Sequence, residues 1–115
     1  MTLQSEITFE EFAKVELRSG TIVKAEPFPK ARKPAYKIWV DFGTEIGTKQ
    51  TSAQVTINYT LENLIGKRVI GCVNLGTKNI GGFTSEFLLV GFEDEGGAIS
   101  LATIDSDVPN GKKLH

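Results

Sequence analysis

Apolar and polar residues alternate with a period of two over several stretches of the chain, which is the pattern of half-buried β-strands. The clearest stretch is residues 36–42, where four apolar side chains alternate with lysine, tryptophan and aspartate. A long strand is also predicted over residues 15–23, with Gly20 as the place for a bulge or sharp bend. Residues 49–55 are predicted to form a polar third strand, after a turn at residues 43–47.

Two nearly continuous apolar runs follow in the second half, at residues 69–73 and 87–92. Runs of this kind are typical of strands that are buried on both faces. A glycine-rich loop through Gly81 and Gly82 separates them. A turn at residues 94–97 then leads into a last extended segment at residues 98–104.

The segment before the first strand predicts a short helix over residues 9–14. Thr8 and Glu11 have the spacing of a capping box, and Ile7 and Phe12 have the spacing of a hydrophobic staple. A helix of this length is too short to be stable alone. Its apolar side, with Phe9 and Phe12, must therefore pack either on the rest of the fold or on a second copy of the chain.

A second helical turn is predicted at residues 60–66, where Thr60 can cap the start and Gly66 the end. The element order is then three strands, a short helix and two more strands, which is the order of an OB-fold. We therefore predict an all-β protein, a five-stranded OB-fold barrel with a short N-terminal helix and a one-turn helix between strands 3 and 4. Residues 1–115 are expected to form one domain, with residues 1–14 as an N-terminal extension and residues 105–115 as a C-terminal tail.

The composition fits a globular protein and argues against several other classes. Of the 115 residues, 40% are hydrophobic, which is ordinary for a domain with a packed core. No stretch approaches the roughly 20 apolar residues of a membrane-spanning helix. Residues 1–14 contain three glutamates instead of the apolar block of a secretory signal, and the one cysteine, Cys72, has no partner for an internal disulfide. We expect a cytoplasmic protein that does not insert into membranes.

Residue types that carry catalysis are scarce. The only histidine is His115, the last residue, so neither a Ser-His-Asp nor a Cys-His arrangement has a well-placed base. Cys72 lies among apolar residues of a predicted strand, as inert core cysteines do. A zinc site would need more cysteines or histidines, and the glycine pairs lack the flanking residues of nucleotide-binding loops. We predict no enzymatic activity, no cofactor and no metal site.

The net charge of −1 hides an uneven distribution of charged residues. Residues 18–85 contain ten basic and four acidic residues, while the rest of the chain contains three basic and ten acidic residues. This pattern indicates either ordinary charge scattered over a solvated surface or one basic face for an anionic partner.

The proline-rich segment at residues 27–34 predicts an irregular loop that carries cations. Lys30, Arg32 and Lys33 lie in this loop, and Lys37 follows on the next strand, on the same strand face as Trp39. Cations for the backbone and aromatic faces for unpaired bases are what single-stranded or looped nucleic acids require. The alternatives are that the lysines serve solubility and that Trp39 packs in the barrel or in a dimer.

The loop at residues 73–86 offers further donors, namely Asn74, Lys78, Asn79 and Ser85. Taken by itself, it is only a polar loop between two core strands.

Five segments of the chain resemble, in order, those of a known family. They are VELRSGTIVKAEPFPKARKPAYKIWVDFG, IGTKQTSAQVT, LIGKRVIGCVNL, IGGFTSEFLLVG and VPNGKKL, and together they cover nearly everything from Val15 to Leu114. The family is the OB-fold tRNA-binding domain that is appended to bacterial methionyl-tRNA synthetases and to related cofactors. The chain is most similar to the stand-alone CsaA-like protein-export chaperones of this family.

The resemblance implies a homodimer of OB barrels that binds unfolded preproteins for export, with tRNA as a further partner. Synthetase-type domains have an Asp-Lys pair after the proline loop, an Arg where this chain has Gly81, and Gly-Met where it has Phe87-Leu88. These departures place the chain on the CsaA side and argue against tight tRNA binding. An accessory tRNA-binding module and a protein-assembly domain with neither activity remain as alternatives.

Three sets of contact residues are expected. The RNA-binding residues are Lys30, Arg32, Lys33, Lys37, Lys49, Ser52, Asn74, Lys78 and Ser85, of which Ser52, Asn74, Lys78 and Ser85 are carried over from the resemblance. The peptide-binding residues are Phe28, Trp39 and Phe83, with Phe28 and Phe83 predicted to be exposed on loops. The dimer-interface residues are Phe9, Phe12, Val108, Pro109 and Leu114.

Overall fold

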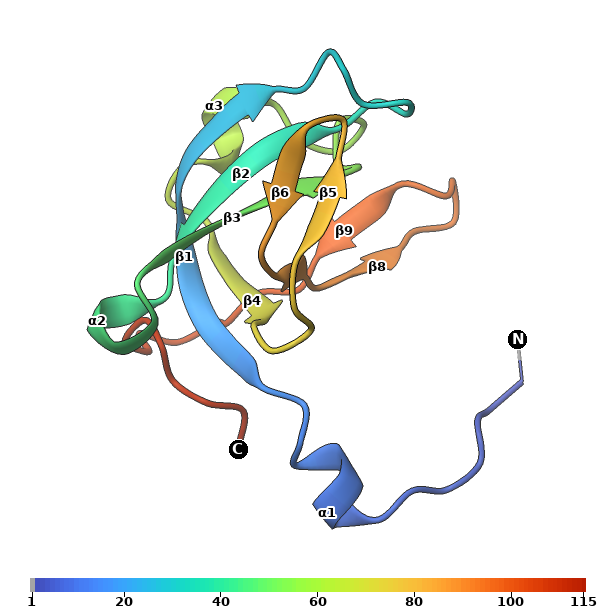
Figure 1. Cartoon of the computed structure of the whole chain (residues 1–115), viewed down its shortest axis with the longest axis vertical. Coiled ribbons are helices and arrows are strands. Elements are labelled where there is room, and N and C mark those ends of the chain that lie inside the picture. The colour runs from blue at the N-terminus through green and yellow to red at the C-terminus, as the bar shows by residue number, and fades with distance from the viewer. Residues whose placement is uncertain (1) are drawn as a thin grey trace.

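The computed structural model describes residues 2–115. Five antiparallel strands form one sheet in the order β3-β2-β1-β4-β7, and the sheet curls into a nearly closed barrel (Figure 1). Its strands are β1 (Leu17–Pro27), β2 (Tyr36–Asp41), β3 (Thr48–Ala53), β4 (Arg68–Cys72) and β7 (Leu88–Leu89). The prediction of a mostly β, OB-like barrel with a few short helices is confirmed.

The core lies where the alternation at residues 36–42 predicts it. Val40 and Phe42 are fully buried, and the pairing of Ile22 with Val40 continues the apolar layer onto β1. Phe42 packs edge-on against Phe87, with ring centroids 4.9 Å apart. Burial of these side chains is the main driving force for closing the sheet.

The apolar run at residues 87–92 is not one buried strand, contrary to the prediction. It divides into β7 and β8 (Gly91–Glu93), and β8 pairs with β9 (Ile99–Leu101) in a separate hairpin. The chain changes its pairing partner at Val90. The Val90 N–H donates to the Ile70 carbonyl of β4, while the Val90 carbonyl accepts from the N–H of Ala102, which follows β9. The run leaves the barrel wall at this point, and Phe92 is 70% exposed.

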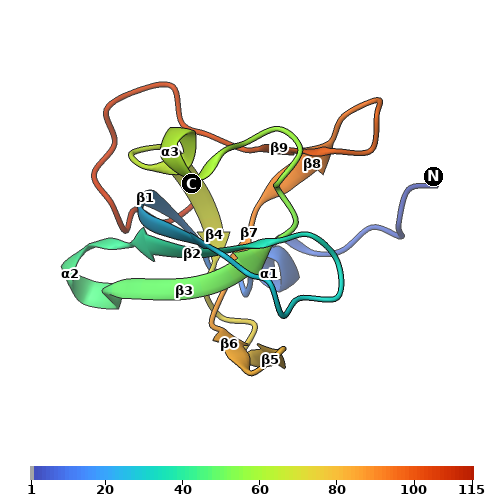
Figure 2. The same cartoon turned by 90° about the horizontal axis from the view of Figure 1, so that it is seen from above.

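The predicted glycine-rich loop contains a β-hairpin that the sequence analysis missed. β5 (Lys78–Ile80) pairs with β6 (Phe83–Ser85), and Gly81 and Gly82 form the turn with φ angles of 55° and 80°. Two consecutive residues at positive φ match the strand twist of a two-residue hairpin and favour glycine. The hairpin projects from the barrel beside β3 (Figure 2).

Single-turn helices complete the fold within residues 2–115: α1 (Phe9–Phe12), α2 (Gly43–Ile46) and α3 (Leu61–Leu64). The predicted capping box of Thr8 and Glu11 is present at α1, and Thr60 caps α3. No helix in this described part of the chain is long and apolar enough to cross a membrane.

The N-terminal helix α1 lies apart from the barrel (Figure 1). Phe9 is 80% exposed and Phe12 is 41% exposed, and α1 buries none of its residues. Packing of this helix on its own barrel, one of the two alternatives, is therefore wrong for this structure.

The C-terminal tail runs along the first half of β1. Ser19 donates its N–H to Lys112, Gly111 donates to Ser19, and Arg18 Nη1 donates to the Gly111 carbonyl over 2.8 Å. Strand β2 pairs with β1 only from Thr21 onward. The tail therefore occupies the position beside β1 that β2 leaves free.

Candidate nucleic-acid interface

Four of the predicted RNA-binding residues form a continuous row across four strands. Lys37 of β2 is paired with Ser52 of β3. Ser52 donates its N–H to Ser85 Oγ over 3.1 Å, and the two hydroxyl oxygens lie 3.2 Å apart. Ser85 of β6 is paired in turn with Lys78 of β5. This row, called here the Lys37–Lys78 row, combines hydroxyl and ammonium donors of the kind that contact phosphate and sugar oxygens.

The three aromatic residues predicted to bind peptide form a packed cluster beside this row. The Phe83 ring packs edge-on against Phe28, at 5.6 Å between centroids, and against Trp39, at 5.9 Å. Phe28 is only 5% exposed, and Phe83 is half-buried in β6, so the expectation that both are exposed loop residues was wrong. The cluster instead joins the proline-rich loop and the β5–β6 hairpin to the outer face of β2.

Two lysines lie over the rings of this cluster. Lys37 Nζ is 5.2 Å from the Phe28 centroid and 5.1 Å from the Phe83 centroid. Lys24 Nζ is 4.6 Å from the Trp39 centroid. Cation–π contacts of this kind hold an ammonium group in place without neutralising it. Lys24 also forms an ion pair with Glu26 at 3.2 Å, which places one carboxylate on the same surface.

Lys24 was not among the predicted RNA-binding residues, because a bulge in β1 changes the side to which it points. Simple alternation would place Lys24 on the same side of β1 as the buried Ile22. The register instead shifts between these two residues, so that Ile22 pairs with Val40 and Lys24 pairs with Trp39. A bulge re-aims the side chains that follow it. The bulge was expected at Gly20, but Gly20 pairs in regular register with Val69 and the shift comes after Ile22.

Gln50 is a second residue that the sequence analysis missed. Its Nε2 donates to the Thr84 carbonyl over 2.9 Å, and its N–H donates to Glu86 Oε1 over 3.0 Å. These bonds hold the β5–β6 hairpin against β3, so Gln50 fixes the hairpin half of the Lys37–Lys78 row. No local pattern in the sequence marks Gln50, because its partners belong to a hairpin that was not predicted.

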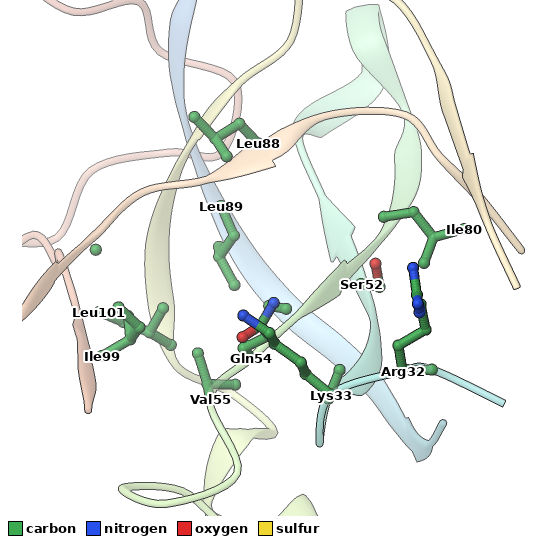
Figure 3. A pocket seen from close by; sticks show the side chains of 14 residues that line it. Arg32, Lys33, Ser52, Gln54, Val55, Ile80, Leu88, Leu89, Ile99 and Leu101 are labelled. Carbon is green, nitrogen blue, oxygen red and sulfur yellow. The ribbon is translucent and has the colours of Figure 1, made fainter. Parts of the chain in front are cut away.

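The predicted cations of the proline-rich loop lie next to this surface. Lys30, Arg32 and Lys33 are all exposed. The main chain of Lys30 lies close to the turn of the β5–β6 hairpin, because a Cβ atom added to Gly81 would be only 3.2 Å from the Lys30 carbonyl oxygen. Arg32 and Lys33 also line a cavity of about 770 Å³ that has Ser52 in its wall (Figure 3). The cationic face is defined here as Lys24, Lys30, Arg32, Lys33, Lys37, Ser52, Lys78 and Ser85.

Lys49 does not belong to the cationic face. It is paired with the buried Val40. It also lies two residues before the buried Thr51, on the same side of β3. Because side chains alternate across a strand, Lys49 lies on the opposite side of β3 from Ser52. The expected grouping of Lys49 with the other cations was therefore wrong.

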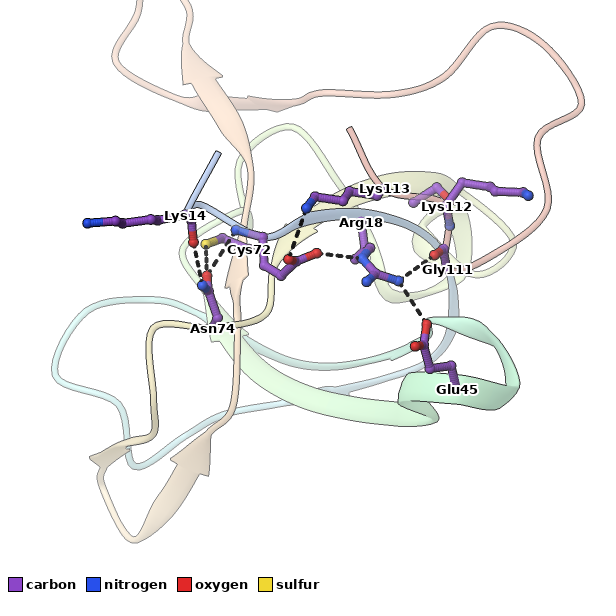
Figure 4. A network of polar contacts seen from close by, with 10 residues as sticks. Lys14, Arg18, Glu45, Cys72, Asn74, Gly111, Lys112 and Lys113 are labelled. Atoms are coloured by element: carbon purple, nitrogen blue, oxygen red, sulfur yellow. Dashed lines mark hydrogen bonds and ion pairs between the residues drawn. The ribbon is translucent and has the colours of Figure 1, made fainter. Parts of the chain in front are cut away.

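Asn74 was also predicted to face RNA, but its amide group is used inside the chain. Its Nδ2 donates to the Lys14 carbonyl over 2.6 Å, and its Oδ1 accepts from the Glu16 N–H over 3.0 Å (Figure 4). Cys72 Sγ lies 3.6 Å from the same oxygen. Asn74 is therefore a tether that holds the N-terminal segment to the end of β4.

The predicted dimer-interface residues fall into two groups. Phe9, Phe12 and Leu114 expose apolar surface, and Leu114 is 44% exposed. The carbonyls of Val108 and Pro109 accept hydrogen bonds from the Arg68 guanidinium and the Ser19 hydroxyl. The main chain of this second group fixes the tail on its own barrel.

Arg18 connects the barrel, α2 and the tail (Figure 4). Its Nε lies 2.8 Å from Glu16 Oε2, and its Nη1 lies 3.1 Å from Glu45 Oε1. The hydrogen bond from Arg18 lowers the pKa of Glu16, to which the charge of Lys113 also contributes. The same pairing raises the pKa of Arg18. This network is structural, and among residues 2–115 no group of three or more His, Cys, Asp or Glu side chains is placed to hold a metal ion.

Comparison with known families gives a match over most of the chain. A family model described as "Putative tRNA binding domain" matches residues 17–113. Methionine–tRNA ligase 1 of Bacillus anthracis is 41% identical over 109 residues, which are 95% of this chain and 16% of the ligase. The methionine–tRNA ligase of Methanocaldococcus jannaschii is 37% identical over 111 residues, 96% of this chain and again 16% of the ligase. The chain thus spans about a sixth of the length of these relatives.

Two solved structures of CsaA proteins match the chain over their whole length. The chaperone CsaA from Bacillus anthracis has a TM-score of 0.90 and 41% identity, covering 96% of this chain and 100% of that chain. The CsaA chaperone protein from Picrophilus torridus has a TM-score of 0.89 and 40% identity, with the same coverage. The chain therefore belongs to the tRNA-binding domain family, and its full-length structural matches include proteins named CsaA chaperones.

Proposed function

We propose that the protein binds tRNA through the cationic face and has no catalytic activity of its own. The observation that carries this proposal is the Lys37–Lys78 row, in which two ammonium groups flank two hydroxyl groups on adjacent strands. Such donors contact the phosphates and sugars of a folded RNA without reading its bases. Recognition by overall shape follows from this chemistry.

The aromatic cluster supports the same mode of binding. Its rings pack against one another and lie beneath Lys24 and Lys37. Stacking of unpaired bases needs an open ring face, so we assign the cluster to positioning the lysines. We expect backbone contacts to dominate and the affinity to be modest and strongly dependent on salt.

A salt-dependent titration tests this proposal. Fluorescence anisotropy of labelled tRNA should give an association constant that falls linearly with salt on a logarithmic scale, because each cation releases counterions. The double variant Lys37→Ala/Lys78→Ala should weaken binding and reduce the slope by about 2. Binding that is absent, or that does not change with salt, would refute the proposal.

A charge-matched control separates the cationic face from net charge. Lys67 lies over the Tyr59 ring, and Lys112 belongs to the C-terminal tail. The variant Lys67→Ala/Lys112→Ala removes the same charge as the test variant. It should leave the tRNA affinity within about twofold of the wild-type value.

A second function is favoured by exposed apolar residues on the N-terminal segment. Leu3 is 99%, Ile7 62% and Phe9 80% exposed. The centroids of the Phe9 and Phe12 rings lie 6.4 Å apart, and exposed apolar patches are typical of protein-binding surfaces. We propose that this segment joins two copies of the chain in a homodimer, and that the dimer binds unfolded preproteins as an export chaperone does.

Two measurements test the second function. Sedimentation should give a dimer mass for the wild type and a monomer mass for Phe9→Asp/Phe12→Asp. Light scattering of a chemically denatured client should show less aggregation with the wild-type protein than with an equal mass of albumin. A monomeric wild type removes the dimer proposal, and unchanged client aggregation removes the chaperone proposal.

A further inference from the structure

The barrel is open along one part of its seam. Strands β3 and β7 are the two edges of the five-stranded sheet. They are joined at one end, where Glu86 donates its N–H to the Gln50 carbonyl over 2.8 Å and Thr51 Oγ1 donates to the Phe87 carbonyl over 2.7 Å. Among the described residues, no hydrogen bond joins residues 53–55 to residues 88–91. The seam is therefore closed at Thr51 and open beyond Ser52.

The cavity of about 770 Å³ occupies this open seam, and its two ends differ in chemistry. Arg32 lies beside Ser52 and Ile80, near the closed end (Figure 3). The other end is apolar and is formed by Val55, Leu89, Ile99 and Leu101. Lys33 adds a second cation to the lining, which contains no acidic residue.

We propose that this cavity binds the carboxyl-terminal end of an extended, apolar polypeptide. The proposal rests on the chaperone function above and locates the peptide on the barrel. It places the peptide along the free edge of β3, where main-chain groups can extend the sheet. Apolar side chains of the peptide then lie against Leu89 and Leu101, and its carboxylate meets Arg32 and Lys33.

The closed end of the seam explains why a chain end is expected there. The bond from Thr51 to Phe87 closes the barrel, so an extended segment that enters from the β8–β9 side cannot continue straight through. An amino terminus would meet Arg32 and Lys33 with like charge. A carboxylate instead gains charge-assisted hydrogen bonds, which are the stronger kind.

The test uses a short peptide of alternating leucine and serine that ends in leucine and carries a fluorophore at its amino end. Anisotropy is measured with the full chain for the peptide with a free carboxylate and for the same peptide as a carboxyl-terminal amide. The double variant Arg32→Glu/Lys33→Glu removes the proposed partners. Lys67→Glu/Lys112→Glu is the matched control, because it makes the same charge change on residues outside both the cavity lining and the cationic face.

The wild type should bind the amide peptide at least ~10-fold more weakly than the peptide with a free carboxylate. The Arg32→Glu/Lys33→Glu variant should bind the free peptide at least ~10-fold more weakly than the wild type does. The control variant should bind the free peptide as the wild type does. Equal binding of amide and free peptides, or equal weakening by both double variants, overturns the inference. The client-aggregation assay separates this proposal from the chaperone function. If the protein protects clients but its peptide binding does not depend on the carboxylate, only the cavity proposal is refuted. If peptide binding depends on the carboxylate but clients are not protected, only the chaperone function is refuted.

Discussion

Ser52 and Ser85 are 33 residues apart in sequence, yet their hydroxyl oxygens lie 3.2 Å from each other where the β5–β6 hairpin meets β3. The two hydroxyl groups have different roles, because only Ser85 Oγ also accepts a hydrogen bond from the main-chain N–H of Ser52, over 3.1 Å. This pair sets the position of the hairpin against the barrel. It thereby places Lys78 in line with Lys37 and creates the central part of the cationic face.

Alanine at these two positions should have different effects on stability. Ser85→Ala leaves the Ser52 N–H without its acceptor, which costs about 1–3 kcal/mol for a poorly hydrated donor. Ser52→Ala leaves that main-chain bond intact and should cost about 1 kcal/mol or less. Urea unfolding of the two variants measures the difference. Equal free energies of unfolding would show that the main-chain bond contributes little.

The single tryptophan provides a direct report of RNA binding. Lys24 lies over the Trp39 ring at 4.6 Å, and a phosphate that pairs with Lys24 would draw the ammonium group from the ring. Titration with tRNA should therefore change the Trp39 emission with the same midpoint as the anisotropy assay. Lys24→Gln should abolish the change in emission and reduce the salt slope by about 1.

A matched lysine serves as the control for this experiment. Lys67 also lies over an aromatic ring, that of Tyr59 at 5.4 Å, but it is not part of the cationic face. Lys67→Gln should preserve the change in Trp39 emission. Saturating tRNA binding with unchanged Trp39 emission in the wild type would contradict the proposed contact at Lys24.

Period and capping signals were sufficient for β2 and for the starts of α1 and α3. The alternation through Val40 and Phe42 gave the buried face of β2, since burial of one face fixes the side to which each residue points. The capping box at Thr8 and Glu11 gave the start of α1. These signals are local, so the residues that carry them lie close together in sequence.

The parts that could not be predicted depend on contacts between distant segments. Val90 changes strand partner because of Ile70 and Ala102, and no local pattern shows this. The same holds for Asn74, whose polarity suggested a ligand while its partners are Lys14 and Glu16. A polar residue in a loop has the same local signal whether it binds a ligand or the chain itself.

Asn74 should control the order of the N-terminal segment without affecting RNA binding. Asn74→Ala removes both hydrogen bonds to residues 14–16, and this segment has few other contacts to hold it. Limited proteolysis should cut residues 8–16 faster, while the tRNA affinity stays unchanged because Asn74 lies outside the cationic face. Asn79→Ala, in the β5 strand, is the control and should not change the cleavage rate. A loss of tRNA affinity in Asn74→Ala would restore the original RNA-binding assignment.

Gly111 should be required for docking of the C-terminal tail. Its φ is +88°, and an added Cβ would lie 2.4 Å from the Phe42 carbonyl oxygen, which is main chain and cannot move aside. Gly111→Ala should therefore lower the free energy of unfolding by about 1–3 kcal/mol. Gly76 has a φ of +80° with nothing within 4 Å of the added atom. Gly76→Ala should cost less, because it adds backbone strain without the clash, and equal costs would argue against the clash.

Glu16 should make the stability of the protein depend on pH in the acid range. The hydrogen bond from Arg18 lowers the pKa of Glu16 in the folded state, while an unfolded glutamate has a pKa of about 4.3. Folding therefore favours the ionised form, and the stabilisation is fully present above about pH 4.3 and is lost as the pH falls through the lower folded value. At pH 7 the wild type should unfold at a higher urea concentration than Glu16→Gln, and the two midpoints should converge by about pH 2. Glu62→Gln, on the exposed side of α3, is the control and should follow the wild type throughout. A constant gap between wild type and Glu16→Gln from pH 7 to pH 2 would mean that the ionised carboxylate does not stabilise the fold through Arg18.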